Sequence, residues 1–141
     1  MRSKLIGLTI SAFLFSVGVS FYTFVDGLSQ RSPDEIHLSV TRQYILEKVY
    51  LRLFFVDCDL AFVRVTDLNE PRKIYRSPLF FGGEFDVKEL FISGRLGTSF
   101  LEFSAEKKSF IFHSKQLRDS WLNRFVANTP YSVESTVRGG E

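Results

Sequence analysis

The stretch "KVYLRLFFV" at residues 48–56, together with "LAFVRVT" at residues 60–66, decides the fold class of this chain. Alternate residues of the first stretch fall on two faces, with Val49, Leu51, Leu53 and Phe55 on one and Tyr50, Arg52 and Phe54 on the other. A period of two is typical of a β-strand. Because the intervening Asp57-Cys58-Asp59 is short and polar, the two stretches predict a hairpin.

Five more segments have a strand-like pattern and are separated by turn-forming residues. They are residues 36–45, 73–81, 85–92, 98–104 and 109–113. Pro78 has no backbone N–H to donate, so it marks 73–81 as an edge strand or a bulged one. About seven short strands with short turns predict a mainly β fold, an antiparallel roll, barrel or sandwich.

The pattern changes to a helical period after Ser114, a residue type that caps helix N-termini. The segment "SKQLRDSWLNRFVANTP" (114–130) ends at Pro130 and predicts a helix over 115–128. Its apolar positions are Leu117, Trp121, Leu122, Phe125 and Val126. We therefore expect a β-rich domain over 34–128 that is capped by this C-terminal helix, followed by a flexible tail over 129–141.

The N-terminal segment "LIGLTISAFLFSVGVSFYTFV" (5–25) has no charged residue and is long enough for a helix to span a bilayer. Arg2 and Lys4 precede it and Asp26 follows it, which favours a cytoplasmic N-terminus and an extracytoplasmic domain. Residues 1–25 are thus predicted to be a membrane anchor, and 26–33, "DGLSQRSP", a linker.

Two other interpretations of this segment stay open. Residues 5–17 could form the core of a secretory signal, with Gly18-Val19-Ser20 supplying small residues for cleavage, and the domain would then be secreted or periplasmic. The segment could also be a buried helix of the soluble domain. The membrane anchor and the cleaved signal both place residues 26–141 on the same side of the membrane.

The charges argue against a nucleic-acid partner. The chain has 18 Lys and Arg against 16 Asp and Glu, and removing Arg2 and Lys4 leaves residues 26–141 neutral. A neutral domain without a basic stripe lacks the electrostatic footprint of nucleic-acid binding.

The sequence indicates no cofactor, no metal and no catalytic grouping, so we expect a protein that is not an enzyme. Cys58 is the single cysteine, and His37 and His113 lie far apart, without the closely spaced ligands that zinc needs. Asp57 and Asp59 offer fewer oxygens than calcium takes. A small envelope hydrolase, with acids or His113 converging in a pocket, remains an alternative.

The string Gly82-Gly83-Glu84-Phe85 is similar to the Gly-Gly-Asp/Glu-Glu-Phe motif of diguanylate cyclases, but it is one acidic residue short. That family also places its motif in a larger α/β domain. We interpret Gly82 and Gly83 as structural residues, with positive φ in a turn or bulge between two strands.

Seven strands followed by a helix with a central Trp resemble the pleckstrin-homology superfold. The specific part of the resemblance is "SFIFHSKQLRDSWLNRF" at residues 109–125. It implies a structural role for Trp121, packed into the open end of a bent sheet. It also implies a lipid- or peptide-binding module as an alternative function, for which Arg42, Lys48 and Arg52 are the basic residues available.

The function that the sequence favours is non-catalytic binding or scaffolding in the cell envelope, with a protein partner and a membrane tether through residues 5–25. The expected contacts are the sheet edge near Pro78 and the aromatic residues Tyr50, Phe54 and Tyr75, on faces predicted to be exposed.

Overall fold

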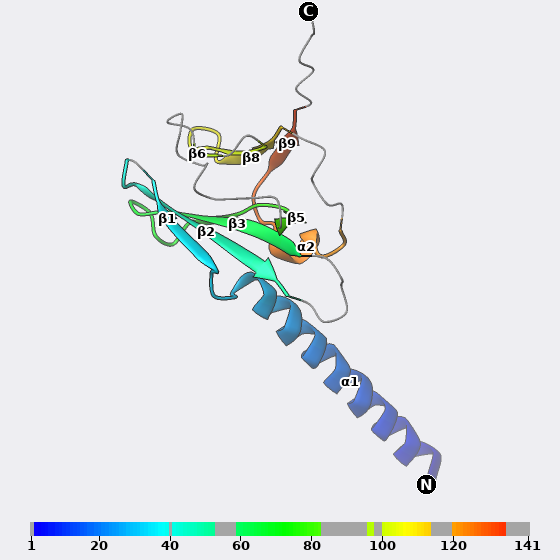
Figure 1. Ribbon diagram of the computed structural model, residues 1–141. Coiled ribbons are helices and arrows are strands. Elements are labelled where there is room, and N and C mark those ends of the chain that lie inside the picture. Colours follow the sequence, from blue (N-terminus) through cyan, green and yellow to red (C-terminus); the bar gives the residue numbers. More distant parts are fainter. Residues whose placement is uncertain are drawn as a thin grey trace, which may run out of the picture. The chain divides into compact units, whose positions relative to one another are not determined.

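The computed structural model describes residues 2–39, 41–52, 59–82, 96–97, 100–113 and 120–134 (Figure 1). The chain divides into two compact units, Met1–Arg31 and Ser32–Glu141. The first is a single helix, and the second holds every described strand together with one short helix. The fold is thus β-rich with mostly antiparallel sheets, as the sequence predicts.

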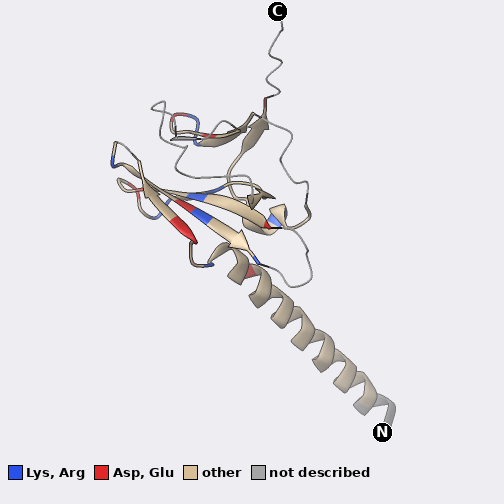
Figure 2. Ribbon diagram, viewed as in Figure 1, with Lys and Arg blue, Asp and Glu red and all other residues tan. Residues whose placement is uncertain are grey.

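Helix α1 spans Arg2–Ser29, which is 28 residues. At 1.5 Å per residue it is about 42 Å long. Its residues Ile6–Ser29 are long and apolar enough to cross a membrane, judged by length and composition. Figure 2 shows this helix almost free of charged residues, whereas the charges gather in the second unit. The helix continues to Ser29, so the predicted linker begins later than residue 26.

Sheet A contains five strands in the order β1-β2-β3-β4, with β5 also paired to β3. All of its pairs are antiparallel. The predicted hairpin is its centre, with register from Tyr44↔Asp67 to Leu51↔Leu60. The strands are β1 (Glu35–Leu38), β2 (Tyr44–Leu51), β3 (Leu60–Asp67), β4 (Ile74–Arg76) and β5 (Phe80–Phe81).

Sheet B has the order β6-β7-β8-β9. Its first two pairs are antiparallel, but β9 pairs with β8 in parallel. The strands are β6 (Leu96–Gly97), β7 (Leu101–Ser104), β8 (Ser109–Phe112) and β9 (Tyr131–Val133). Strand β9 lies within residues 129–141, which the sequence predicts to be a flexible tail. These residues form a strand because they pair with β8, a segment distant in the sequence.

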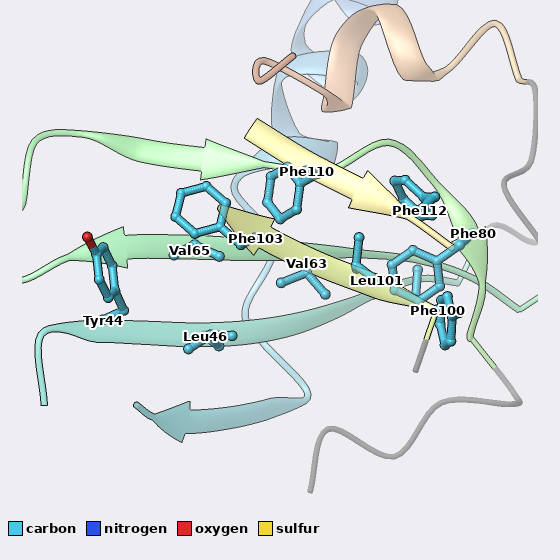
Figure 3. Close-up of a cluster of buried hydrophobic side chains, with 11 residues drawn as sticks. Tyr44, Leu46, Val63, Val65, Phe80, Phe100, Leu101, Phe103, Phe110 and Phe112 are labelled. Atoms are coloured by element: carbon cyan, nitrogen blue, oxygen red, sulfur yellow. The ribbon is translucent and has the colours of Figure 1, made fainter. Parts of the chain in front are cut away.

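The core lies between the two sheets and is rich in phenylalanine (Figure 3). Sheet A contributes Tyr44, Leu46, Ala61, Val63, Val65 and Phe80, and residues 100–112 contribute Phe100, Leu101, Phe103, Phe110 and Phe112. The rings of Phe103 and Phe110 lie 5.1 Å apart, in a tilted geometry. Such aromatic pairs add about 0.5–1.5 kcal/mol each beyond the area they bury.

Three predicted elements differ in their bounds. The segment 36–45 is two strands, because Arg42 adopts φ 55° and turns the chain between β1 and β2. The segment 73–81 is also two strands, interrupted where the Ser77 hydroxyl accepts the Val63 N–H (2.9 Å). The helix predicted over 115–128 is described only as α2, Asn123–Val126. The predicted strand 85–92 lies outside the described residues.

Candidate functional site

Tyr50 and Tyr75 do not form the exposed contact surface that the sequence predicts, because both pack against the core. The Tyr50 hydroxyl donates to the Gly82 carbonyl oxygen at 3.0 Å. The Tyr75 ring lies 5.2 Å from that of Phe103. Val49 and Leu51, on the face predicted to be internal, are buried, but the opposite face, which carries Tyr50, is internal as well because it packs against the phenylalanine-rich cluster. Phe54 lies outside the described residues.

The sheet edge near Pro78 is covered by the chain's own residues 123–129. The Arg76 N–H donates to Asn128 Oδ1 (2.7 Å) and to Thr129 Oγ1 (3.0 Å). The Asn128 side chain donates in turn to the Ile74 carbonyl (2.8 Å). Farther along, the Leu79 N–H donates to Asn123 Oδ1 (2.8 Å). These backbone groups are therefore already hydrogen-bonded within the chain, as in edges that natural proteins cover.

Strand β1 is the edge of sheet A that the described chain leaves open, since it pairs only with β2 among the described strands. Its residues alternate, with Glu35 and His37 half-buried and Ile36 and Leu38 exposed by 61% and 50%. The Ser39 N–H donates to the Tyr44 carbonyl, so ladder bonds fall on odd-numbered residues. The backbone groups of Ile36 and Leu38 therefore point away from β2.

Gly82 is structural, but for a reason other than the one predicted. Its φ lies outside the left-handed range that favours glycine. A Cβ placed there would overlap the Tyr50 ring, 2.9 Å from Cδ1 and closer still to Cε1, and would lie 3.0 Å from Ala61 Cβ. Glycine is thus needed for close approach rather than for a positive φ. Gly83 lies outside the described residues.

The resemblance to the pleckstrin-homology superfold implies a buried Trp121, but the structure shows it exposed. Its side chain is 56% exposed and meets Phe125 edge to face, with ring centroids 5.8 Å apart. The apolar positions of this segment that are buried are Leu122 and Val126. Trp121, which precedes α2, and Phe125, which lies within it, are both exposed, and we call them the aromatic pair.

The basic residues weighed for lipid binding do not converge. Arg42 precedes β2 and Arg52 follows it, so the eight residues of the strand separate them by about 26 Å. Arg52 is paired with Asp34 at 2.9 Å. Lys48 faces the interior, with its Nζ 3.7 Å from Glu35 Oε1 and 4.8 Å from the centre of the Tyr50 ring. The described geometry thus offers no shared basic pocket among these three.

A polar cluster joins the two sheets at the β7–β8 turn. Lys108 Nζ donates to the Tyr44 hydroxyl (3.2 Å) and to Asp67 Oδ2 (3.3 Å). The hydrogen bond to Tyr44 raises the pKa of Lys108 despite partial burial. Burial alone would raise the pKa of Asp67, but the Asn69 N–H and Lys108 outweigh it and lower that pKa. Both shifts favour the charged forms, so the cluster is a cross-sheet ion pair rather than an acid–base pair.

His113, Glu102 and Glu134 form a second polar cluster, which their spacing in the sequence does not predict. The Nε2 of His113 lies 3.3 Å from Glu102 Oε2, and its Nδ1 lies 4.0 Å from Glu134 Oε2. His37 is 3.9 Å from Glu35 on β1. Within the described ranges, no group of three or more His, Cys, Asp or Glu side chains is arranged to hold a metal ion. Asp57 and Cys58 fall outside those ranges.

The chain matches no protein-family model, and comparison with curated proteins and with solved structures finds no similar protein. The site is therefore assigned from geometry. Of the surfaces described above, the β1 edge combines open backbone groups with two exposed apolar side chains, and these are the features that recognise an extended peptide.

Proposed function

We propose that this chain is a single-pass membrane protein of the cell envelope, with a non-catalytic domain that binds a protein partner on the extracytoplasmic side. The support for the anchor is helix α1, which is apolar over Ile6–Ser29. Arg2 and Lys4 at its N-terminus favour a cytoplasmic start under the positive-inside tendency.

The observation that carries the binding function is the open β1 edge with Ile36 and Leu38 exposed on one face. A partner strand that pairs with β1 gains main-chain hydrogen bonds, and its apolar side chains cover Ile36 and Leu38. Natural proteins blunt unwanted edges with charge, proline or a covering loop. The opposite edge, at β4, has such a cover, whereas the described chain leaves β1 open.

Topology mapping tests the anchor. A reporter that is active only outside the cytoplasm is fused after residue 30 in one chain and after residue 141 in another, and the mature mass is measured. We expect both fusions to be active and the mass to retain residues 5–25. Activity with a mass that lacks this segment would replace the anchor by a cleaved signal. Inactive fusions would overturn the extracytoplasmic assignment.

Site-specific photocrosslinking in cells tests the binding surface. A photoreactive side chain at position 36 or 38 is expected to crosslink to one envelope protein. The matched control is position 68, because Leu68 is also apolar and 42% exposed but lies beyond β3. The same crosslink from position 68, or none from 36 and 38, would refute binding at this edge.

A further inference from the structure

The aromatic pair is held rigidly on the surface of the domain. Leu122 and Val126 are buried on the other side of the same segment. The Asn123 side chain accepts the Leu79 N–H at 2.8 Å, and the Val126 carbonyl accepts from Arg76 Nε at 2.8 Å. Trp121 and Phe125 are therefore presented outward by a fixed segment, with the exposed Arg124 between them.

The segment that carries the pair runs along the sheet edge between Arg76 and Leu79, next to the end of sheet A at which the chain begins the domain. Asp34 accepts from the Tyr50 N–H and from Arg52 at the end of β2, both at 2.9 Å. Leu51 pairs with Leu60, and Leu60 pairs with Phe81. Two residues before Phe81, Leu79 is bonded to Asn123 of α2. We call this the proximal end of sheet A.

Chain connectivity sets how far the proximal end can lie from a membrane. Helix α1 ends at Ser29 and Asp34 is hydrogen-bonded to the end of β2, so residues 30–33 are the whole connection. Four extended residues span at most about 14 Å. This length is no greater than about the radius of gyration of a 100-residue domain, about 13 Å, so the start of the domain stays near any bilayer that α1 spans.

The chemistry of the pair fits the bilayer interface. Trp is enriched at the level of the lipid headgroups, where its ring is apolar and its N–H is polar. An adjacent Arg suits anionic headgroups, and Phe inserts among the upper acyl carbons. We propose that Trp121 and Phe125 insert into the interface of the bilayer that α1 spans and hold the domain against it. This inference rests on the proposed membrane anchor.

Trp121 is the only tryptophan of the chain, so its fluorescence reports its surroundings directly. The full chain is reconstituted in vesicles of phosphatidylcholine and phosphatidylglycerol, with or without bromine on the acyl chains. Brominated lipid is expected to reduce Trp121 emission. The control is W121F/Y131W, which moves the fluorophore to β9, where Tyr131 is 46% exposed. Emission from the control is expected to be nearly the same in both vesicle types.

The outcomes separate this contact from the anchor. A chain that resists alkaline carbonate extraction, yet shows no more quenching than W121F/Y131W, would overturn the contact alone. A chain that carbonate extracts would overturn the anchor and the contact together. Trp121 shielded from aqueous acrylamide but insensitive to brominated lipid would assign the pair to a second copy instead of lipid.

A charge reversal adds a test that leaves the fluorophore in place. R124E is expected to reduce quenching in vesicles that contain phosphatidylglycerol, because it replaces attraction to anionic headgroups with repulsion. R72E is the matched control, since Arg72 is also exposed but lies in the β3–β4 turn, away from the proximal end. Equal quenching in R124E and R72E would contradict a role for Arg124 at the headgroups.

Discussion

Tyr50 and Gly82 are fitted to each other across sheet A: the tyrosine ring occupies the space where a side chain at position 82 would begin, and its hydroxyl donates to the Gly82 carbonyl at 3.0 Å. The Lys48 ammonium lies over the same ring. The pair thus joins the end of β2 to the end of β5, two segments about thirty positions apart in the chain.

G82A is expected to destabilise the domain by about 1–3 kcal/mol, because the added methyl group overpacks the site. Chemical unfolding of the full chain in detergent measures the change. In a Y50A background the same substitution should cost less, since the obstructing ring is gone, and the difference gives the coupling free energy. Equal costs in both backgrounds would show that the ring is not the obstacle.

D67N is expected to destabilise the domain at about pH 7 and to have a smaller effect in acid. The pKa of Asp67 is lowered from its ordinary value of 3.8, so its stabilising contribution is complete above that pH and is lost as the pH falls through the folded-state pKa. Urea midpoints of wild type and D67N at about pH 7 and about pH 3 measure this. A gap of the same size at both pH values would contradict the ion pair with Lys108.

The contacts of Lys108 with Asp67 and Tyr44 also predict that the domain loses stability in alkali. The pKa of Lys108 is raised above its ordinary value of 10.5, so its contribution is present below that pH and is lost as the pH rises through the folded-state pKa. The free energy of unfolding of K108M is therefore expected to lie furthest below that of wild type at neutral pH. In strong alkali the two values should converge. E106Q, at an exposed position in the same turn, is the control and should stay within about 0.5 kcal/mol of wild type.

N128A is expected to open the β4 edge. It removes the hydrogen bonds of the Asn128 side chain with Arg76 N–H and the Ile74 carbonyl, at about 0.5–1.5 kcal/mol each. We expect a loss of about 1–3 kcal/mol and a greater tendency to aggregate through the exposed edge. N69A is the matched control, because Asn69 uses its backbone N–H to reach Asp67 and that bond survives the substitution.

I36K/L38K is expected to keep the fold and lose the partner. Both side chains are exposed, so the free energy of unfolding should change by no more than about 0.5 kcal/mol each. Because positions 36 and 38 are substituted, the photoreactive side chain is placed at a neighbouring position on β1 in both wild type and variant. Charges on an edge strand oppose strand addition, so the crosslink to the envelope protein should be formed by wild type and lost in the variant. A retained crosslink in a stably folded double variant would rule out β1 as the contact.

The central hairpin was predictable because two stretches rich in β-branched and aromatic residues, each alternating over part of its length, flank the short polar Asp57-Cys58-Asp59. The bilayer-length helix was predictable for a similar reason, as its signal is a continuous apolar run. Both signals are local. For residues 73–81 the sequence predicts an edge or bulged strand, because Pro78 has no N–H to donate. The structure has two strands there, β4 and β5, on either side of Pro78.

The contacts between distant segments were not predictable from local pattern. Alternation showed that Tyr50 and Val49 face opposite ways, but not that sheet B would cover the Tyr50 face. Nothing near Pro78 in the sequence indicates that Asn128 will satisfy Arg76. Positive φ at Arg42 and Lys108 also gave no signal, because turns at such positions are usually marked by glycine or asparagine.

The cover on the β4 edge has a consequence for synthesis of the chain. Arg76 is bonded to Asn128, which follows it by 52 residues. At about 5–20 residues per second, a ribosome takes about 3–10 s to add that stretch. During this interval the nascent domain has two uncovered edge strands, and a premature stop before Asn128 would make that state permanent. A chaperone that shields bare strands would therefore act on this polypeptide before any partner of the finished fold.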